Sequence, residues 1–161
     1  MPEETQFDEL LSVLHSSGVK FILVGGLAAM AHGSNRATLD VDVVYERGSD
    51  NCRRIVESLQ PFSPYLRGAP PGLPFVWDVA TLEGGLNFTL ETKIGALDLL
   101  GEIAGGGTYE SLQNSCDTIQ VFGIKCDCVT LERLIELKRA AGRPKDLEAI
   151  AELEFLLSNR P

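Results

Sequence analysis

Apolar and polar residues follow two different periods in the first quarter of the chain. Over residues 4–17 apolar side chains recur at helical spacing, which predicts a helix that ends at Gly18. Residues 21–24 are continuously apolar and directly precede Gly25-Gly26. This pattern predicts a buried strand that meets a tight turn.

Strict alternation of apolar and polar residues follows over residues 38–46 and predicts a second strand. The side chains of one face are apolar: Leu39, Val41, Val43 and Tyr45. The opposite face carries Asp40, Asp42 and Val44.

The remaining patterns predict helices at 27–33, 50–60, 130–141 and 144–157, and strands at 88–94, 96–100, 119–122 and 124–129. Residues 61–74 hold five of the eight prolines and predict a loop. A hairpin-like region with Gly84-Gly85 as its turn follows, and residues 105–107 mark a flexible connection. We therefore expect an α/β (α+β) fold with a mixed central β-sheet flanked by helices.

A chain of 161 residues is long enough for one domain, and it contains no repeat or low-complexity tract. We expect a single domain over 1–161, with the sheet over about 19–129 and a C-terminal helical pair over about 130–158. The acidic, amphipathic N-terminus does not have the pattern of a signal peptide, and the apolar runs are too short to cross a membrane. These features favour a cytoplasmic location without a membrane partner.

Four cysteines change this picture little. Cys52, Cys116, Cys126 and Cys128 lack the paired spacing of a structural zinc site. In a cytoplasmic protein we expect no disulfides, and the alternating pair Cys126 and Cys128 is predicted to be buried.

The formal net charge of −9 disfavours non-specific binding to nucleic acid, because such proteins usually carry a basic face. The few basic residues gather near the C-terminus, where they can form a local pocket for a triphosphate. Bound divalent metal would neutralise part of the acidic excess.

Asp40 and Asp42 are two residues apart on the predicted strand, so their carboxylates point the same way. Like charges at that distance repel, and a hard cation such as Mg²⁺ removes the repulsion. Asp98 lies between two leucines in another apolar strand, where an unpaired carboxylate is costly. Three such carboxylates suffice for two Mg²⁺ ions that assist phosphoryl transfer. The alternatives are an edge strand with one solvated face for the pair, and an arginine partner for Asp98.

Gly25 and Gly26 lack side chains, so backbone N–H groups there can approach phosphates closely. A lone glycine pair is weak support for a phosphate site. The support is stronger here because the pair lies at the end of a strand and upstream of Asp40.

These residues resemble the signature of the nucleotidyltransferase superfamily related to DNA polymerase β. That signature is an apolar strand, Gly-Gly or Gly-Ser, about a dozen residues, and then two carboxylates that flank an apolar residue. The segments GGLAAMAHGSNRATLDVD, TLETKIGALDLLG and LIELKRAAGRPKDLEAIAELE are similar to those of small bacterial AbiEii-toxin-like nucleotidyltransferases. Gly26 stands where the commoner form has serine, and glycine is usual in the AbiEii-like branch.

The resemblance implies transfer of a nucleoside monophosphate from an NTP to an acceptor hydroxyl, with loss of pyrophosphate. Asp40 and Asp42 would hold both Mg²⁺ ions. Asp98 would complete the second metal site and help to deprotonate the acceptor. Gly25 and Gly26 would cradle the triphosphate. The acceptor is an RNA, a protein or a small molecule, and the branch implies a toxin with a cognate antitoxin.

Four further residues are candidates for the nucleotide-binding site. Lys138 lies on an apolar helical stripe and best matches a functional lysine of AbiEii-like proteins. Asp146 at the start of the last helix orients the site or caps the helix. Lys145 and Arg36 contact phosphate or are solvated surface residues.

Two alternatives to an Mg²⁺-dependent nucleotidyltransferase with an unknown acceptor remain open. One is a catalytically degenerate binding module of the same fold. The other is a transferase that modifies aminoglycoside-type small molecules, although about 60 residues after Asp98 leave little room for an acceptor domain.

Overall fold

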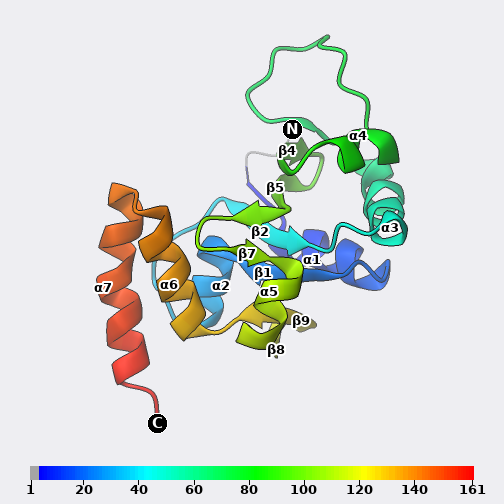
Figure 1. Ribbon diagram of the computed structural model, residues 1–161. Coiled ribbons are helices and arrows are strands. Elements are labelled where there is room, and N and C mark those ends of the chain that lie inside the picture. The colour runs from blue at the N-terminus through cyan, green and yellow to red at the C-terminus, as the bar shows by residue number, and fades with distance from the viewer. Residues whose placement is uncertain (1–3) are drawn as a thin grey trace.

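The computed structural model describes residues 4–161, and a seven-stranded mixed sheet forms its centre (Figure 1). Its strands are β1 (Phe21–Val24), β2 (Asp40–Tyr45), β3 (Tyr65–Leu66), β4 (Asn87–Thr92), β5 (Gly95–Leu100), β8 (Cys116–Val121) and β9 (Ile124–Val129). Across the sheet the order is β3-β4-β5-β2-β1-β9-β8. Strand β2 is parallel to β5 and β1 is parallel to β9, whereas the other neighbours are antiparallel. The predicted mixed α/β architecture is confirmed.

Helices cover both faces of this sheet. They are α1 (Phe7–Ser16), α2 (Gly25–Ala31), α3 (Ser49–Leu59), α4 (Val79–Gly84), α5 (Tyr109–Leu112), α6 (Leu131–Ala141) and α7 (Pro144–Ser158). Two short 3-10 turns, Gln60–Phe62 and Gln113–Ser115, and a small hairpin of β6 (Glu102–Ile103) and β7 (Gly107–Thr108) complete the chain. Helices α1 and α3 contact each other below one face, while α2 and α6 contact each other by the opposite face, with α7 beside α6 (Figure 1).

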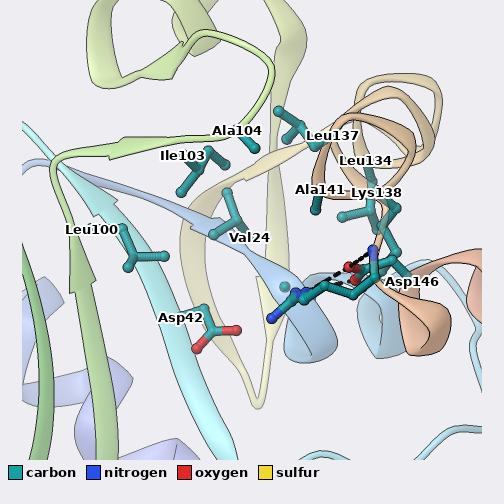
Figure 2. Close-up of a pocket in the computed structure, with 12 residues that line it drawn as sticks. Val24, Asp42, Leu100, Ile103, Ala104, Leu134, Leu137, Lys138, Ala141 and Asp146 are labelled. Carbon is teal, nitrogen blue, oxygen red and sulfur yellow. Dashed lines mark hydrogen bonds and ion pairs between the residues drawn. The ribbon is translucent and has the colours of Figure 1, made fainter.

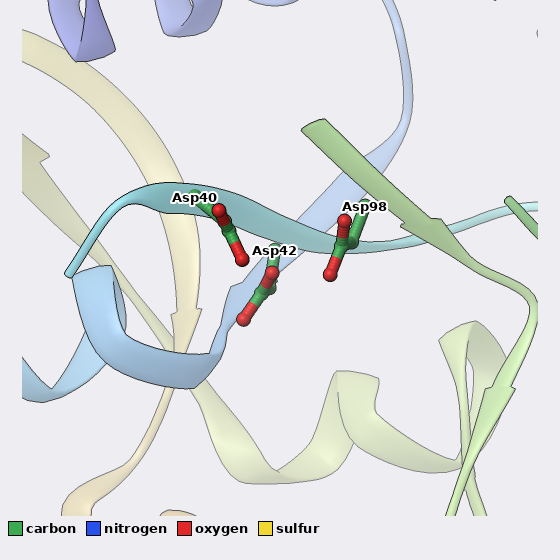
Figure 3. Close-up of side chains that lie close together, drawn as sticks. All are labelled: Asp40, Asp42 and Asp98. Carbon is green, nitrogen blue, oxygen red and sulfur yellow. The ribbon is translucent and has the colours of Figure 1, made fainter. Parts of the chain in front are cut away.

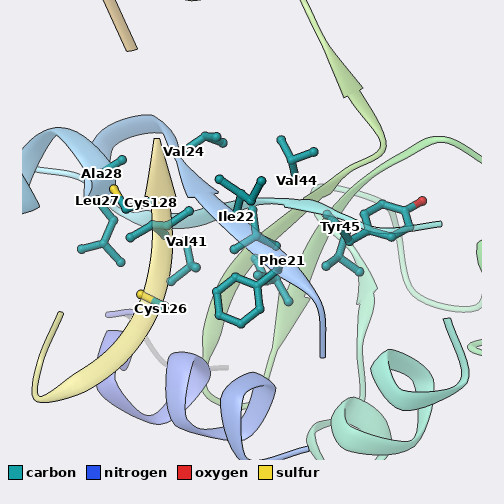
Figure 4. Packing of buried hydrophobic residues seen from close by; sticks show 14 of the residues in the cluster. Phe21, Ile22, Val24, Leu27, Ala28, Val41, Val44, Tyr45, Cys126 and Cys128 are labelled. Atoms are coloured by element: carbon teal, nitrogen blue, oxygen red, sulfur yellow. The ribbon is translucent and has the colours of Figure 1, made fainter. Parts of the chain in front are cut away.

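Helices on both faces of the sheet contribute to the core, among them α1 and α3 on one face. Phe21 and Val41 point toward these helices, while Val24 and Val44 point to the opposite face (Figure 4). Alternation along β2 therefore buries Val41, Val43 and Tyr45 as the sequence predicts. Leu39 was wrongly included in that face, because it precedes β2 and is 76% exposed.

Three predicted loop or turn regions contain more regular structure than the sequence predicts. The Pro-rich segment 61–74 contains strand β3, whose two residues are too few to show periodicity. The hairpin-like region before residue 86 is helix α4, which Asp78 caps by accepting a hydrogen bond from the Thr81 N–H at 2.8 Å. Gly84 thus ends a helix, and the glycines at 105–107 lead into β7 rather than forming only a connection.

The buried positions predicted for Cys126 and Cys128 are confirmed. Within residues 4–161, no helix combines the length and apolar character needed to cross a bilayer.

Candidate functional site

The pairing of β2 with β5 brings three aspartates together on one face of the sheet. Asp42 is the register partner of Asp98, and Asp40 is that of Ala96 on the same strand pair. One carboxylate oxygen from each of Asp40, Asp42 and Asp98 lies within 4.8 Å of the other two (Figure 3). We call these three residues the carboxylate triad. The grouping predicted from the sequence is thus present in the structure.

The triad has the properties of a cation site. Oδ1 of Asp42 is buried and has no hydrogen-bond partner among the described residues. Burial, and then the neighbouring charge of Asp98, raise the pKa of Asp42 from 3.8 to about 7. A hard cation would both satisfy the orphaned oxygen and remove the repulsion, and oxygen ligands suit Mg²⁺. The residues present therefore fit magnesium.

Glycines keep the space beside the triad open. Gly25 has a φ of +69°, and helix α2 begins directly at this residue instead of after a separate turn. A Cβ atom at Gly25 would collide with the carboxylate of Asp42. A Cβ atom at Gly26 would lie 2.6 Å from Oγ1 of Thr38. Both positions thus require glycine for reasons that the Gly-Gly pattern alone does not reveal.

A cavity of about 270 Å³ lies beside Asp40 and Asp42, between α2, the 34–38 segment and α7. All six residues predicted to bind nucleotide line it: Gly25, Gly26, Arg36, Lys138, Lys145 and Asp146. Arg143 adds a further cation. Four acidic residues, Asp40, Asp42, Asp146 and Glu152, also line this space. We call it the cationic pocket after its four basic side chains, which can contact a polyphosphate.

Asp146 holds two of these cations in place (Figure 2). Its side chain is 1% exposed and accepts hydrogen bonds from Arg143 Nε at 2.6 Å and Arg143 Nη2 at 3.1 Å. Lys138 Nζ lies 3.6 Å from the same carboxylate. Although burial favours the neutral form, these contacts lower the pKa of Asp146. Asp146 also caps α7 by accepting a hydrogen bond from the Arg143 backbone N–H, so the capping role considered from the sequence is present, and its role at the nucleotide site stays a prediction.

The other two predicted cations are less constrained. Arg36 forms an ion pair at 3.6 Å with Glu148, and both side chains are largely exposed. Lys145 lines the cationic pocket from the first turn of α7. Both can therefore reorient toward a ligand at little cost.

A second cavity, of about 120 Å³, also borders Asp42 (Figure 2). Its walls are mostly apolar and include Leu100, Ile103, Leu134 and Leu137. We call it the apolar pocket. It shares Gly25, Asp42, Lys138, Arg143 and Asp146 with the cationic pocket, so the two spaces meet beside the triad.

Two residues at this site were not predicted. Arg143 is one of the basic residues near the C-terminus, and the sequence pattern does not single it out as a site residue. Arg67 lies in the segment predicted to be a loop, and its Nη2 donates to Oδ1 of Asp98 at 2.7 Å. The arginine partner considered for Asp98 therefore exists, and Asp98 belongs to the triad as well.

No protein-family model and no curated protein matches the sequence. Solved structures do match. The lincosamide antibiotic adenylyltransferase LnuA, determined with lincomycin bound, is similar with a TM-score of 0.61 and 15% identity, over 96% of this chain and 99% of that chain. TM1012 of Thermotoga maritima, a candidate nucleotidyltransferase, has a TM-score of 0.56 and 15% identity, over 96% of this chain and 91% of that one.

The chain has the nucleotidyltransferase fold. Because identity is only 15%, this likeness establishes the fold, and the chemistry is argued from the site itself. Within this nucleotidyltransferase fold, Asp42 lines both pockets, Asp40 lines the cationic pocket, and Asp98 completes the triad on the same sheet face.

Proposed function

We propose that this protein is an Mg²⁺-dependent nucleotidyltransferase that transfers a nucleoside monophosphate from an NTP to an acceptor hydroxyl. The observation that carries the proposal is the orphaned Oδ1 of Asp42 within the triad, at the wall of a pocket with four basic side chains. An acidic centre beside a pocket with basic side chains suits a metal-bound triphosphate.

The proposed role of each residue follows from its position in the site. Asp40, Asp42 and Asp98 would hold the metal, which would polarise the phosphoryl group under attack and bring the acceptor oxygen into line. Lys138 and Arg143, fixed by Asp146, would neutralise the charge that builds on the departing pyrophosphate. The new bond joins the acceptor oxygen to the α-phosphorus, and the bond from that phosphorus to the β-phosphate bridging oxygen breaks. Asp98 is the carboxylate proposed to take the hydroxyl proton.

The apolar pocket suits the nucleoside of the same NTP. Its apolar walls cannot compensate the charge of a phosphate, but they can bury a planar base. Since it shares five lining residues with the cationic pocket, one ligand can span both spaces. The acceptor would then approach from the side of Asp98, which lines neither pocket.

Two classes of acceptor follow from different observations. The resemblance to AbiEii-like proteins supports a macromolecular acceptor and a toxin role with a cognate antitoxin. A small-molecule acceptor gains support from LnuA, since the match covers 99% of that antibiotic adenylyltransferase. The expectation that antibiotic transfer needs an added acceptor domain therefore carries little weight for a chain of this length.

Radiolabel transfer tests the proposal. The protein is incubated with each α-labelled NTP and Mg²⁺, together with cell RNA, cell protein or a panel of hydroxyl-bearing antibiotics. We expect label on one acceptor pool, and loss of that label with Asp40→Asn. Asp50→Asn, on the surface of α3, removes a carboxylate far from the triad and should leave transfer intact.

If no label is transferred, thermal unfolding of the protein with NTP and Mg²⁺ distinguishes two explanations. Metal-dependent stabilisation by NTP without any transfer would indicate the degenerate binding module. Absence of both transfer and stabilisation would overturn the enzyme proposal.

A further inference from the structure

Arg67 makes contacts with three carboxylates at the edge of the triad. Its Nη2 lies 2.7 Å from Asp98 Oδ1, its Nη1 lies 3.5 Å from Asp40 Oδ2, and its Nε lies 3.1 Å from Glu91 Oε1. Only 25% of the side chain is exposed. In a partly buried setting these contacts are shielded from solvent and salt more than a surface pair would be.

The sheet register explains how Arg67 reaches the triad. Strand β3 pairs with β4, and the Arg67 N–H donates to the Thr89 carbonyl at 2.9 Å directly after β3. Thr89 is in turn the partner of Asp98, and Asp98 of Asp42. Thr89, Asp98 and Asp42 therefore form one row across three neighbouring strands, and Arg67 extends this row just after the end of β3.

The guanidinium neutralises the triad unevenly. It contacts Asp40 and Asp98, but no donor among residues 4–161 contacts Asp42 Oδ1. A second cation thus still gains energy by entering beside Asp42. Any cation held jointly by the three carboxylates must share Asp40 and Asp98 with the positive charge of Arg67.

We propose that Arg67 is a resident counter-ion of the triad that arranges Asp40 and Asp98 before metal binds and competes with the metal for them. The entering cation takes over Asp40, at the longer of the two contacts, and Arg67 keeps Asp98 in position. This inference rests on the proposed function for the identity of the cation as a divalent metal. It assigns Arg67 as a positioning residue that sets the metal concentration at which the site becomes occupied.

Other contacts allow Arg67 to remain at the sheet when Asp40 is released. Its Nη2 also donates to the Leu90 carbonyl at 2.8 Å, and the Nε contact to Glu91 does not involve the triad. The side chain can therefore shift within the site without losing all of its partners. A merely structural arginine would make the same contacts but would be indifferent to metal.

Metal affinity without nucleotide distinguishes these roles. Mn²⁺ binding is measured by calorimetry and by the electron paramagnetic resonance signal of free Mn²⁺ for wild type, Arg67→Gln and Arg67→Lys. Arg53→Gln is the matched control, because it removes one positive charge from an exposed ion pair on α3. We expect Arg67→Gln to bind Mn²⁺ roughly tenfold more tightly, within the usual range of coupling between two sites. Arg53→Gln should bind as wild type does, and Arg67→Lys should fall between.

A measurement on the unsubstituted protein accompanies the variants. The Nε–H of Arg67, protected by Glu91, should give an observable resonance in ¹⁵N-labelled protein, assigned by its absence in Arg67→Lys. Titration with Mg²⁺ alone should shift this resonance and leave that of Arg53 in place. The result holds even if Arg67→Gln fails to fold.

Two results would overturn the inference that Arg67 competes with metal and would leave the proposed function standing. One is equal or weaker Mn²⁺ binding by folded Arg67→Gln. The other is an Arg67 resonance that does not shift at saturating Mg²⁺. Absence of Mn²⁺ binding by every variant would overturn this inference and the metal-dependent function together. Failure of NTP transfer alone would leave the Arg67 result unaffected.

Discussion

Asp42 and Asp98 occupy the same register position on the parallel strands β2 and β5, so their carboxylates lie side by side on one face. Burial, together with this pairing, raises the pKa of Asp42 to about 7. Near neutral pH, Asp42 is therefore protonated in a large share of the molecules when no metal is bound.

Metal binding should therefore release a proton. Because a carboxyl with a pKa of about 7 must be deprotonated to ligate a cation, Mn²⁺ affinity should increase as pH rises from about 6 to 8 and level off above that range. Calorimetry in buffers of different ionisation enthalpy would measure the number of protons released. A flat affinity across this pH range would contradict the raised pKa of Asp42.

Asp42→Asn should stabilise the metal-free protein above pH 7. The folded-state pKa of Asp42 is raised above 3.8, so its contribution to stability is fully present below pH 3.8 and is lost as pH rises through about 7. Asparagine is never charged, and we expect a gain of about 1–3 kcal/mol in unfolding free energy at pH 8, typical of relieving a poorly satisfied buried group.

Denaturant unfolding at pH 5 and pH 8 checks this expectation. The difference between Asp42→Asn and wild type should be larger at pH 8, and saturating Mn²⁺ should reverse it by stabilising wild type alone. Asp50→Asn should show no such pH dependence, since Asp50 lies in an exposed ion pair on α3. A stability difference between Asp42→Asn and wild type that is the same at both pH values would show that the pKa of Asp42 is not raised in the folded protein.

Gly25→Ala should weaken metal binding far more than its effect on stability suggests. Both Gly25 and Gly123 have left-handed backbone conformations, with φ of +69° and +77°, so alanine costs each about 1–2 kcal/mol. Only at Gly25 does the added Cβ meet the carboxylate of Asp42, whereas nothing lies within 4 Å of such a Cβ at Gly123.

The matched pair Gly25→Ala and Gly123→Ala separates the two effects. We expect Gly25→Ala to lose more unfolding free energy than Gly123→Ala, because only Gly25→Ala adds a steric collision with Asp42. Mn²⁺ affinity should fall by roughly 10- to 100-fold for Gly25→Ala only, as for other residues that orient metal ligands. Equal metal affinity in the two variants would mean that Asp42 can move away from the new methyl group without loss.

The strand with alternating aspartates was predictable because alternation fixes which side chains share a face. Asp98 could be added because a carboxylate within an apolar strand requires a partner. The sequence does not contain the register, however, and only the β2–β5 pairing places Asp98 opposite Asp42. The short distances between the three carboxylates thus depend on long-range strand pairing that local patterns do not encode.

Arg67 and helix α4 show where local patterns fail. Arg67 follows a two-residue strand in a Pro-rich segment, which is too short for any period to appear. Its importance comes from contacts with residues 24 and 31 positions later, at Glu91 and Asp98. In α4, the glycine pair suggests a turn. The cap at Asp78 instead favours a helix that begins after Asp78 and ends at Gly84.

Asp146→Asn should reduce both stability and polyphosphate binding. The carboxylate is buried and holds Arg143 and Lys138 at the cationic pocket, so its neutralisation should cost about 1–3 kcal/mol, as for hydrogen bonds to charged groups. Glu154→Gln is the control, because its ion pair with Arg139 is exposed and should be worth at most about 1 kcal/mol.

Pyrophosphate binding tests the second part, since pyrophosphate probes the cationic pocket without a nucleoside. We expect Asp146→Asn to bind it roughly tenfold more weakly in the presence of Mg²⁺, because about 1.4 kcal/mol of preorganisation of Arg143 and Lys138 is lost. Glu154→Gln should bind it as wild type does. If Asp146→Asn loses stability but binds pyrophosphate normally, Asp146 serves α7 as a cap and the two cations find the phosphates without it.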